Sequence, residues 1–492
     1  MLIDVKASNR LAGKTPVDIA PLLAALAHAA PQSSLDLSRL RVVLDWVQYR
    51  QSFRSMIDVR KILPSALQAG NGDGEAFEIA VDLRRAATAT DLESELAAAL
   101  SAPGAKEGDC RQYLEEWRPG SESCIWDFNG LYWKALGLWE EATGREYEQA
   151  LPGGETDARN TAAARELILQ LFSMWDGLAE RRALPEDLWV LELGPGNGNH
   201  ARVFLDQFVQ LDHEHHGDYY RRLHYLMGDY SSHVVERARE NVSAHKEHVS
   251  SLVMDARQPS ATLGFLRGKA FLIYISNVYD NLPTDEVVRI GGHLFRVDAR
   301  AYIPCDAATQ IAADLGVEPK DVAELVRRLL DLGPDLLARA APERFPGGPL
   351  AAVALWRAVW DALLLEERYV PIEGLDAYRL TPTISGEVLR PIVDANGDIR
   401  MHVSNGAATS FLDSLPLLHP FGILQCHDLF VTDVQQYQSF RGPGKYDGSV
   451  VNWINGPLLA AIGRRAGYDV TYHPFAHRAG SNIMTMTARV RE

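Results

Sequence analysis

A run of glycines follows an apolar segment near the middle of the chain. Residues Leu188–His200 read LWVLELGPGNGNH, and the apolar stretch ends in Gly194-Pro195-Gly196-Asn197-Gly198. Glycine lets a ligand approach the backbone where a side chain would clash, and the first N–H groups of a following helix are free to bind it. The spacing therefore predicts a nucleotide-type site at the end of a buried strand.

The charge beside this turn indicates which nucleotide the site prefers. Dinucleotide sites use G-x-G-x-x-G to hold a pyrophosphate, but here the third glycine, Gly198, comes one residue early. Glu192 precedes the first glycine by two residues, where it would repel a diphosphate and suit a cationic amino group. S-adenosylmethionine (SAM) has an ammonium, a sulfonium and a ribose but no phosphate, so it fits better than a nicotinamide dinucleotide.

The segment LELGPGNGNHARVF resembles motif I of class I SAM-dependent methyltransferases. It is most similar to the ELGPG-x-G version of the MidA-like family, and SNVYDNLP, residues 276–283, is similar to that family's N-E-F-F-D-A-L-P segment. The resemblance covers residues 188–305 well and residues 400–492 loosely. It implies an α/β fold with a seven-stranded Rossmann-like sheet whose last strand is antiparallel, together with a helical N-terminal region and a helical insertion.

The resemblance also implies how the cofactor is held. Asp229 stands where this class holds the ribose hydroxyls, and Asp255 stands where it accepts from the adenine amino group. The alternative for Asp229 is a helix N-cap, because Asp229 and Ser231 precede a predicted helix. The implied cofactor-binding residues are Glu192, Gly194, Pro195, Gly196, Asn197, Gly198, Asp229, Tyr230, Asp255, Ala256, Ser276 and Asn277.

Candidate catalytic residues follow the predicted fourth and fifth strands. Asn277 and Asp280 lie where the fourth strand opens toward the methyl acceptor, and Asn277 replaces the family's Glu, so a negative charge that could hold a guanidinium is missing. His427 and Asp428 end the strand GILQCHD, where a histidine of ordinary pKa would suit deprotonation of a hydroxyl acceptor. The alternative is a structural histidine at a strand end.

The elements that must position these residues change character along the chain. We expect a mainly helical region at 1–125, with helices over PLLAALAHAA, LSRLRVVLDWVQYRQSF and ATDLESELAAALSA, and an aromatic-rich helical segment at 126–187. Short apolar runs then alternate with helices, as in parallel sheets with crossover helices. We predict the first part of the SAM-binding core at 188–305, a helical insertion or lid at 306–395, and the second part of the core at 396–492, ending in an antiparallel hairpin.

Two further segments have alternative interpretations. The loop PGGETDARN, residues 152–160, either covers the methionine end of SAM or is an ordinary turn with a helix cap. In the insertion, Leu355, Trp356 and Trp360 favour a small organic acceptor but are explained almost as well by core packing. The histidines at 213, 215 and 216 are interpreted as a solvated loop, so no metal is expected.

Composition narrows the class of partner. The 492 residues carry a formal net charge of -16, which argues against nucleic acid as a partner. The 4 cysteines form no C-x-x-C pair, and no apolar run is long enough to span a membrane, so we expect a cytoplasmic protein without a membrane partner. A homo-oligomer is left open.

The function predicted from the sequence is methyl transfer from SAM to an oxygen or nitrogen of a small organic acceptor. One alternative is a protein arginine methyltransferase, as the MidA-like resemblance suggests. Another is a SAM-binding assembly factor without turnover, and a nicotinamide dehydrogenase is the most remote.

Overall fold

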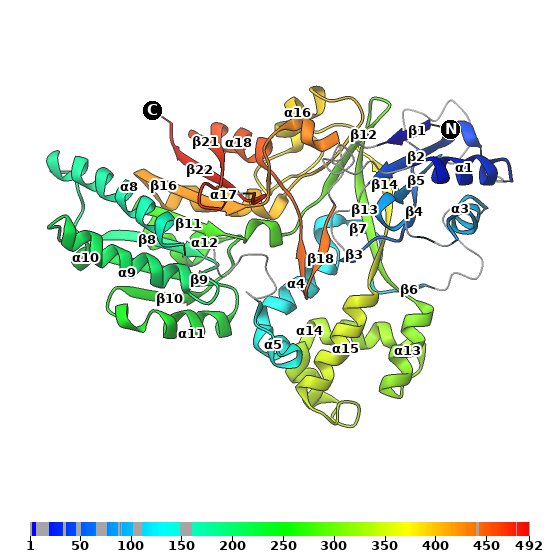
Figure 1. Ribbon diagram of the computed structural model, residues 1–492, viewed down its shortest axis with the longest axis horizontal. Coiled ribbons are helices and arrows are strands. Elements are labelled where there is room, and N and C mark those ends of the chain that lie inside the picture. Colours follow the sequence, from blue (N-terminus) through cyan, green and yellow to red (C-terminus); the bar gives the residue numbers. More distant parts are fainter. Residues whose placement is uncertain are drawn as a thin grey trace. The chain divides into compact units, whose positions relative to one another are not determined.

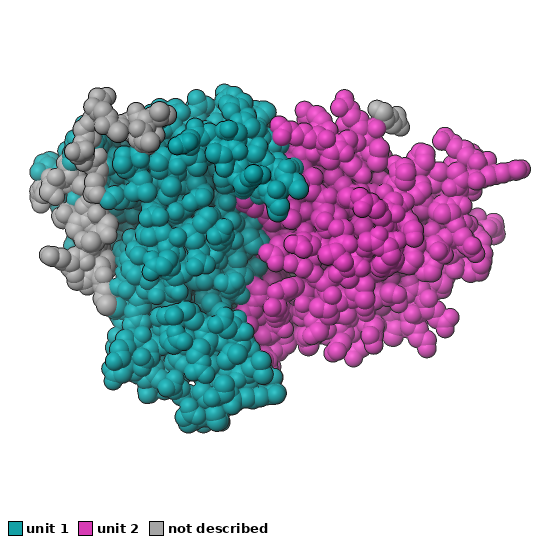
Figure 2. All heavy atoms as spheres, turned by 180° about the vertical axis from the view of Figure 1, so that it is seen from behind, with its two compact units in different colours: residues 1–129, 283–403, 433–453 teal, residues 130–282, 404–432, 454–492 magenta. Residues whose placement is uncertain are grey.

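The chain folds into two compact units. A computed structural model describes residues 2–5, 19–32, 36–45, 51–64, 76–86, 89, 91–101, 111–147, 160–438, 442–478 and 480–491. Unit 1 comprises Met1–Asn129, Pro283–Val403 and Asp433–Trp453, and unit 2 comprises Gly130–Leu282, Ser404–Thr432 and Ile454–Glu492 (Figure 2). Each unit is therefore built from three separate segments of the chain.

Unit 2 is an α/β unit around a seven-stranded sheet (Figure 1). Its strand order is β10-β9-β8-β11-β16-β22-β21. The first five strands in this order are mutually parallel, whereas β22 is antiparallel to both β16 and β21. The bounds are β8 Leu188–Leu193, β9 Leu223–Asp229, β10 Val249–Val253, β11 Ala270–Ser276, β16 Leu418–Asp428, β21 Tyr468–Pro474 and β22 Met484–Val490. The predicted terminal hairpin, β21 with β22, is confirmed.

Helices enclose this sheet because its central strands are apolar on both faces. Along β8, Leu188 and Val190 belong to a cluster with helices α8 and α9, while Leu191 and Leu193 are equally buried although they point to the opposite face. The helices and short strands of unit 2 are α5 Leu136–Thr143, α8 Thr161–Glu180, α9 Asn199–Glu214, α10 Tyr219–Arg222, α11 Ser232–Asn241, α12 Pro259–Leu263, α17 Asn405–Ser414, α18 Gly456–Arg465, β17 Phe430–Val431 and β20 Ile454–Asn455. Helix α4, Ile125–Lys134, begins in unit 1 and ends in unit 2.

Unit 1 contains a ten-stranded mixed sheet of order β1-β2-β5-β4-β14-β13-β12-β15, with β6 and β7 also pairing to β13. Its strands are β1 Leu2–Val5, β2 Leu40–Asp45, β4 Ile57–Ile62, β5 Ala76–Asp82, β6 Arg111–Tyr113, β7 Arg118–Pro119, β12 Glu286–Ile290, β13 His293–Pro304, β14 Leu364–Pro371 and β15 Ile399–His402. A small sheet joins β3 Gln51–Ser52, β18 Gly444–Tyr446 and β19 Ser449–Val451. Its helices are α1 Ala20–Ala29, α2 Leu83–Ala86, α3 Leu92–Ser101, α13 Cys305–Leu315, α14 Val322–Ala340, α15 Pro349–Ala362 and α16 Arg390–Asp394.

The prediction of a mainly helical region at 1–125 is wrong in part. Helices α1 and α3 lie where their periodicity predicts them, but the stretch 37–53 contains the strand β2 instead of a helix. All six residues of β2 are buried between its neighbours β1 and β5. A strand covered on both faces shows no polar alternation, so its pattern cannot be separated from that of a buried helix.

The predicted boundaries of the insertion also differ from the structure. Strands β12 and β13 fall inside the predicted core segment 188–305, and β15 inside 396–492, yet all three belong to the sheet of unit 1. Gly291 and Gly292, both with positive φ, form the tight turn between β12 and β13. Such a Gly-Gly turn is typical of a hairpin. The insertion therefore contains the predicted helices α13, α14 and α15, and it also contributes strands to the ten-stranded sheet of unit 1.

Among the described residues, no helix combines the length and the apolar character needed to cross a membrane.

Candidate functional site

The carboxyl ends of five parallel strands meet at one edge of the unit 2 sheet. Backbone hydrogen bonds join them: Gly194 N–H donates to Gly228 O at 2.8 Å, Met254 N–H to Asp229 O at 2.7 Å, and Asn277 N–H to His427 O at 3.0 Å. In open α/β sheets, ligands bind outside this edge. The fold thus brings together the predicted site segments that follow β8, β9, β10, β11 and β16.

The glycine turn after β8 has a backbone that other residues adopt only with strain. Gly194, Gly196 and Gly198 have φ of 70°, 55° and 74°. A Cβ on Gly194 would lie 2.4 Å from Val278 Cγ2, and one on Gly198 would lie 2.9 Å from the Ala238 backbone. The turn therefore requires glycine both for its conformation and for its close contacts.

The remaining residues of the turn close it onto helix α9. Gly198 is the N-cap of α9 and its N–H donates to Pro195 O at 2.9 Å. Asn197 is buried, and its carbonyl accepts from Asn241 Nδ2 at 2.9 Å. The structure therefore anchors the turn to α11 as well as to α9.

Glu192 points into the core rather than toward the edge of the sheet. Its carboxylate is buried, accepts from the Tyr225 hydroxyl at 2.7 Å and lies 3.1 Å from His200 Nδ1. The His200 ring stacks on Tyr274 at 3.8 Å between centroids. Both carboxylate oxygens thus have partners inside unit 2.

Asp229 ends β9 next to the glycine turn. Its carboxylate accepts the Ser231 N–H at 2.9 Å, while the N-cap of α11 is Ser231, whose hydroxyl accepts from Val234 N–H. The alternative role of Asp229 as that N-cap is therefore wrong. Burial raises the pKa of Asp229 to about 7, the Ser231 and Tyr230 N–H groups oppose this shift, and the negative charge of Glu192 adds to it.

Tyr230 and Asp255 lie at the adjoining ends of β9 and β10. Tyr230 is 38% exposed, and Lys134 Nζ of α4 lies 4.9 Å from its ring centroid. Asp255 forms an ion pair with Arg257 at 2.7 Å, and hydrogen bonds from Arg257 hold the pKa of Asp255 below its usual value although burial opposes them. Ala256 is fixed by its carbonyl, which accepts from the Ser410 hydroxyl.

The segment after β11 turns sharply at Asn277, whose φ is 52°. Ser276 ends the strand, and Asn281 Nδ2 donates to Asp280 Oδ1 at 2.7 Å within the short helical turn Tyr279–Asn281. Burial, followed by the charge of Asp428, raises the pKa of Asp280 well above its usual value. Burial and the neighbouring Asp428 thus both disfavour the ionised form of Asp280.

Asp428 holds this turn in place. One of its oxygens accepts from Tyr279 N–H at 2.9 Å and Asp280 N–H at 3.3 Å, and the other accepts from Leu429 N–H at 2.8 Å. Its side chain is fully buried, and burial raises its pKa to about 6. The geometry thus makes Asp428 a structural partner of the Asn277 turn, not a group that reaches an acceptor.

His427 has partners at both ring nitrogens. Gln425 Nε2 donates to His427 Nε2 at 3.0 Å, and His427 Nδ1 lies 2.9 Å from the Thr485 hydroxyl. Burial, with the nearby His200 and His477, lowers the pKa of His427 to about 3. This environment supports the alternative of a structural histidine, because a base should have a pKa near the working pH.

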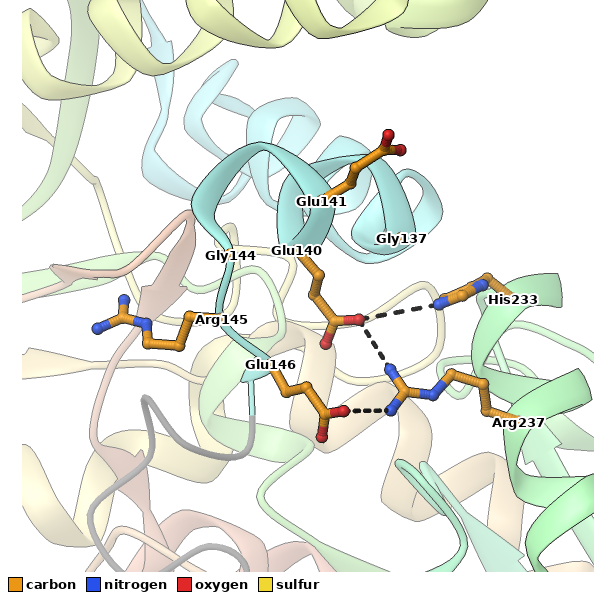
Figure 3. Close-up of a pocket in the computed structure, with 8 residues that line it drawn as sticks. All are labelled: Gly137, Glu140, Glu141, Gly144, Arg145, Glu146, His233 and Arg237. Carbon is orange, nitrogen blue, oxygen red and sulfur yellow. Dashed lines mark hydrogen bonds and ion pairs between the residues drawn. The ribbon is translucent and has the colours of Figure 1, made fainter.

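An open pocket of about 510 Å³ lies between helices α5 and α11 (Figure 3). Helix α11 begins two residues after Tyr230. Charged residues line it, namely Glu140, Glu141, Arg145, Glu146, His233 and Arg237. Arg237 pairs with Glu140 at 2.8 Å and with Glu146 at 3.1 Å, whereas Glu141 and Arg145 point away from these pairs.

Two interpretations of other segments can be compared with the structure. Leu355, Trp356 and Trp360 are buried in unit 1, and Trp360 packs edge-on against Phe53 at 5.4 Å, so core packing accounts for them. Of the loop 152–160, only Asn160 lies among the described residues, where it is the N-cap of α8.

Sequence reasoning missed residues whose roles depend on contacts between strands. A Cβ on Gly228 would lie 2.2 Å from Met254 Sδ, so this glycine lets the end of β10 approach β9. Tyr225 and His200 hold Glu192, and Val278 packs against Gly194. Gly228 had a usable signal, since a glycine inside a strand marks a close approach; the others had none.

Comparisons with known proteins agree with the cofactor prediction. Residues 167–323 match the model of a family described as "Putative S-adenosyl-L-methionine-dependent methyltransferase". This match confirms the resemblance to class I, MidA-like SAM-dependent methyltransferases and the prediction of SAM as cofactor. No curated protein is similar in sequence to the chain.

Three solved structures from Burkholderia thailandensis are similar to it. An uncharacterized protein is 11% identical with a TM-score of 0.44, and the alignment covers 76% of this chain and 87% of that one. A "likely methyl transferase" bound to S-adenosyl-homocysteine is 13% identical with a TM-score of 0.41, covering 76% and 88%. A 1,6-didemethyltoxoflavin-N1-methyltransferase is 9% identical with a TM-score of 0.34, covering 78% and 99%. With TM-scores below 0.5, these structures by themselves define neither fold nor substrate.

Proposed function

We propose that unit 2 is a SAM-dependent methyltransferase with the class I sheet arrangement, and that it transfers a methyl group to an oxygen or nitrogen of a small organic acceptor. The observation that carries this proposal is the glycine turn at the end of β8 beside Asp229 at the end of β9. Neighbouring strands place a glycine-rich turn next to a carboxylate. A carboxylate that accepts hydrogen bonds suits a ribose diol, and a glycine-rich turn suits close approach of the methionine end.

The residues around the turn fit SAM in their chemistry. Bound SAM supplies a methyl group on a sulfonium, which is electrophilic without further activation. Asp229 would accept from the two ribose hydroxyls, and Asp255 with Tyr230 would contact the adenine. The buried charge of Glu192 would favour the cationic end of SAM over a diphosphate.

The residues after β11 and at the end of β16, here called the acceptor edge, favour a methyl acceptor whose attacking atom needs no prior removal of a proton. His427 is neutral with its ring nitrogens engaged, and Asp428 accepts from three backbone N–H groups. A nitrogen lone pair or an already ionised oxygen needs only alignment with the methyl group. Asn277 also stands in place of the family's Glu and supplies no negative charge for a guanidinium, which supports a small acceptor over a protein arginine.

The first test is calorimetric titration of the full chain with SAM, S-adenosylhomocysteine and NAD. We expect binding of the first two and none of NAD, followed by transfer of labelled methyl to a small-molecule extract rather than to polypeptide. Label in polypeptide would favour the protein methyltransferase, and binding without label in either fraction would favour the assembly factor. NAD binding without SAM binding would overturn the proposal.

We expect His427→Gln to keep the kcat and KM within about threefold, because a group with a pKa of about 3 is not the base. Glutamine retains hydrogen-bonding groups at this buried position. The measurement is the pH dependence of kcat. Loss of a step between pH 6 and pH 7 in the variant would instead identify His427 as a general base.

A further inference from the structure

The segment Gly130–Tyr147, which comprises the end of α4 and all of α5, packs against α11 in unit 2. Gly137 allows this approach, because a Cβ there would lie 3.1 Å from the His233 ring. Helix α11 begins two residues after Tyr230. The segment therefore lies against the helix that follows the proposed ribose-binding carboxylate.

An ion pair holds α5 on α11, and its Arg237 side chain is 28% exposed (Figure 3). Glu140, whose side chain is 11% exposed, pairs with Arg237 at 2.8 Å and also accepts the Tyr147 N–H at 3.0 Å. Arg237 pairs in addition with Glu146 at 3.1 Å. Removal of Arg237 leaves the mostly buried Glu140 carboxylate without its cation, and removal of Glu140 leaves Arg237 with only the exposed Glu146 as an ion-pair partner among the described residues.

The same segment reaches the residues at the ends of β9 and β10. Lys134 Nζ lies 4.9 Å from the centroid of the Tyr230 ring, and a Cβ on Gly130 would lie 4.0 Å from Tyr230 Cε1. At the end of the neighbouring strand β10, Arg257 pairs with Asp255 at 2.7 Å. The segment therefore contacts Tyr230 at the end of β9, beside the strand β10 that precedes Asp255.

We propose that the segment Gly130–Tyr147 forms a wall of the cofactor site at its adenosine end, with Glu140 and Arg237 as the positioning pair that keeps this wall on α11. This inference rests on the proposed function. Neither residue touches the cofactor; they act through Lys134 and Tyr230.

The ion pair is tested by affinity for S-adenosylhomocysteine, measured by calorimetry at low and high salt, together with the melting temperature of the unliganded protein. We expect Glu140→Gln and Arg237→Gln each to weaken binding about tenfold, as in couplings between a support and a site. The reversed pair Glu140→Arg with Arg237→Glu should recover part of the loss. The control is Arg165→Gln, which removes an exposed pair with Glu214 at 3.3 Å in the same unit and should leave affinity unchanged.

A second variant distinguishes displacement of α5 from a change in the stability of the helix. Gly137→Ala raises the helix propensity of α5 but crowds His233, whereas Gly177→Ala in α8 makes the same change with no atom within 4 Å. We expect Gly137→Ala to weaken S-adenosylhomocysteine binding severalfold and Gly177→Ala to leave it intact. Unchanged affinity in both Glu140→Gln and Gly137→Ala would overturn the wall while leaving the proposed function standing. Failure of the unsubstituted chain to bind would overturn the proposed function itself.

Discussion

Gly194→Ala should weaken SAM binding by about a hundredfold or more, where each tenfold step corresponds to about 1.4 kcal/mol. Two costs add at this position. Alanine at a φ of 70° is strained by about 1–2 kcal/mol, and its Cβ would lie 2.4 Å from Val278 Cγ2. Because Val278 follows the Asn277 turn, relief of this clash moves either the glycine turn or the acceptor edge. The measurement is calorimetric titration with SAM.

Two further variants identify the cause of that loss. Gly268→Ala places alanine at the same φ of 70° with no atom within 4 Å, so it should cost stability without changing SAM affinity. Adding Val278→Ala to Gly194→Ala removes the clash but not the strain, so it should restore part of the binding. If Gly194→Ala binds SAM as the unsubstituted chain does, the glycine turn is not the cofactor site.

Asp229→Ala should weaken SAM binding about fiftyfold at pH 8, because it removes a charged acceptor from two ribose hydroxyls. The SAM affinity of Asp229→Asn should fall between those of Asp229→Ala and the unsubstituted chain, since the amide oxygen of asparagine still accepts one hydrogen bond. The measurement is again calorimetric titration, and near-equal affinity of Asp229→Ala and the unsubstituted chain would show that the ribose binds elsewhere.

The pH dependence of SAM binding follows from the same residue. Burial raises the pKa of Asp229 to about 7 in the unliganded protein, whereas ribose hydroxyls stabilise the ionised form in the complex. Affinity should therefore be constant above about pH 8 and fall by up to tenfold per pH unit below pH 7, with proton release on binding. The Asp229→Asn variant should show no such slope.

Asp255→Asn provides a matched control for this slope. The pKa of Asp255 is held below its usual value, so that carboxylate stays ionised over the same pH range. Its substitution should lower affinity at every pH but retain the slope below pH 7. A slope that disappears in Asp255→Asn and persists in Asp229→Asn would contradict the assignment of the titrating group.

The sequence by itself determined the conformation of the glycine turn at which we propose that the cofactor binds. Glycines at 194, 196 and 198 encode a backbone conformation directly, since only glycine adopts positive φ without strain. Asp229 and Asp255 follow short apolar runs that become strands, and parallel strands bring their carboxyl ends to one edge. Local patterns of this kind need no knowledge of distant contacts, which is why the class of ligand could be predicted.

Only the tertiary structure decided which polar residues at that edge remain available to a ligand. Glu192, Asp428 and His427 have the residue types of functional groups, yet each is engaged by partners far away in the sequence, such as Tyr225, Tyr279 and Thr485. The strand β2 was not predicted for a related reason, because a strand that is covered on both faces shows no alternation of polar and apolar residues. Burial and partner atoms set both the pKa and the accessibility of a side chain, and neither is written in its spacing along the chain.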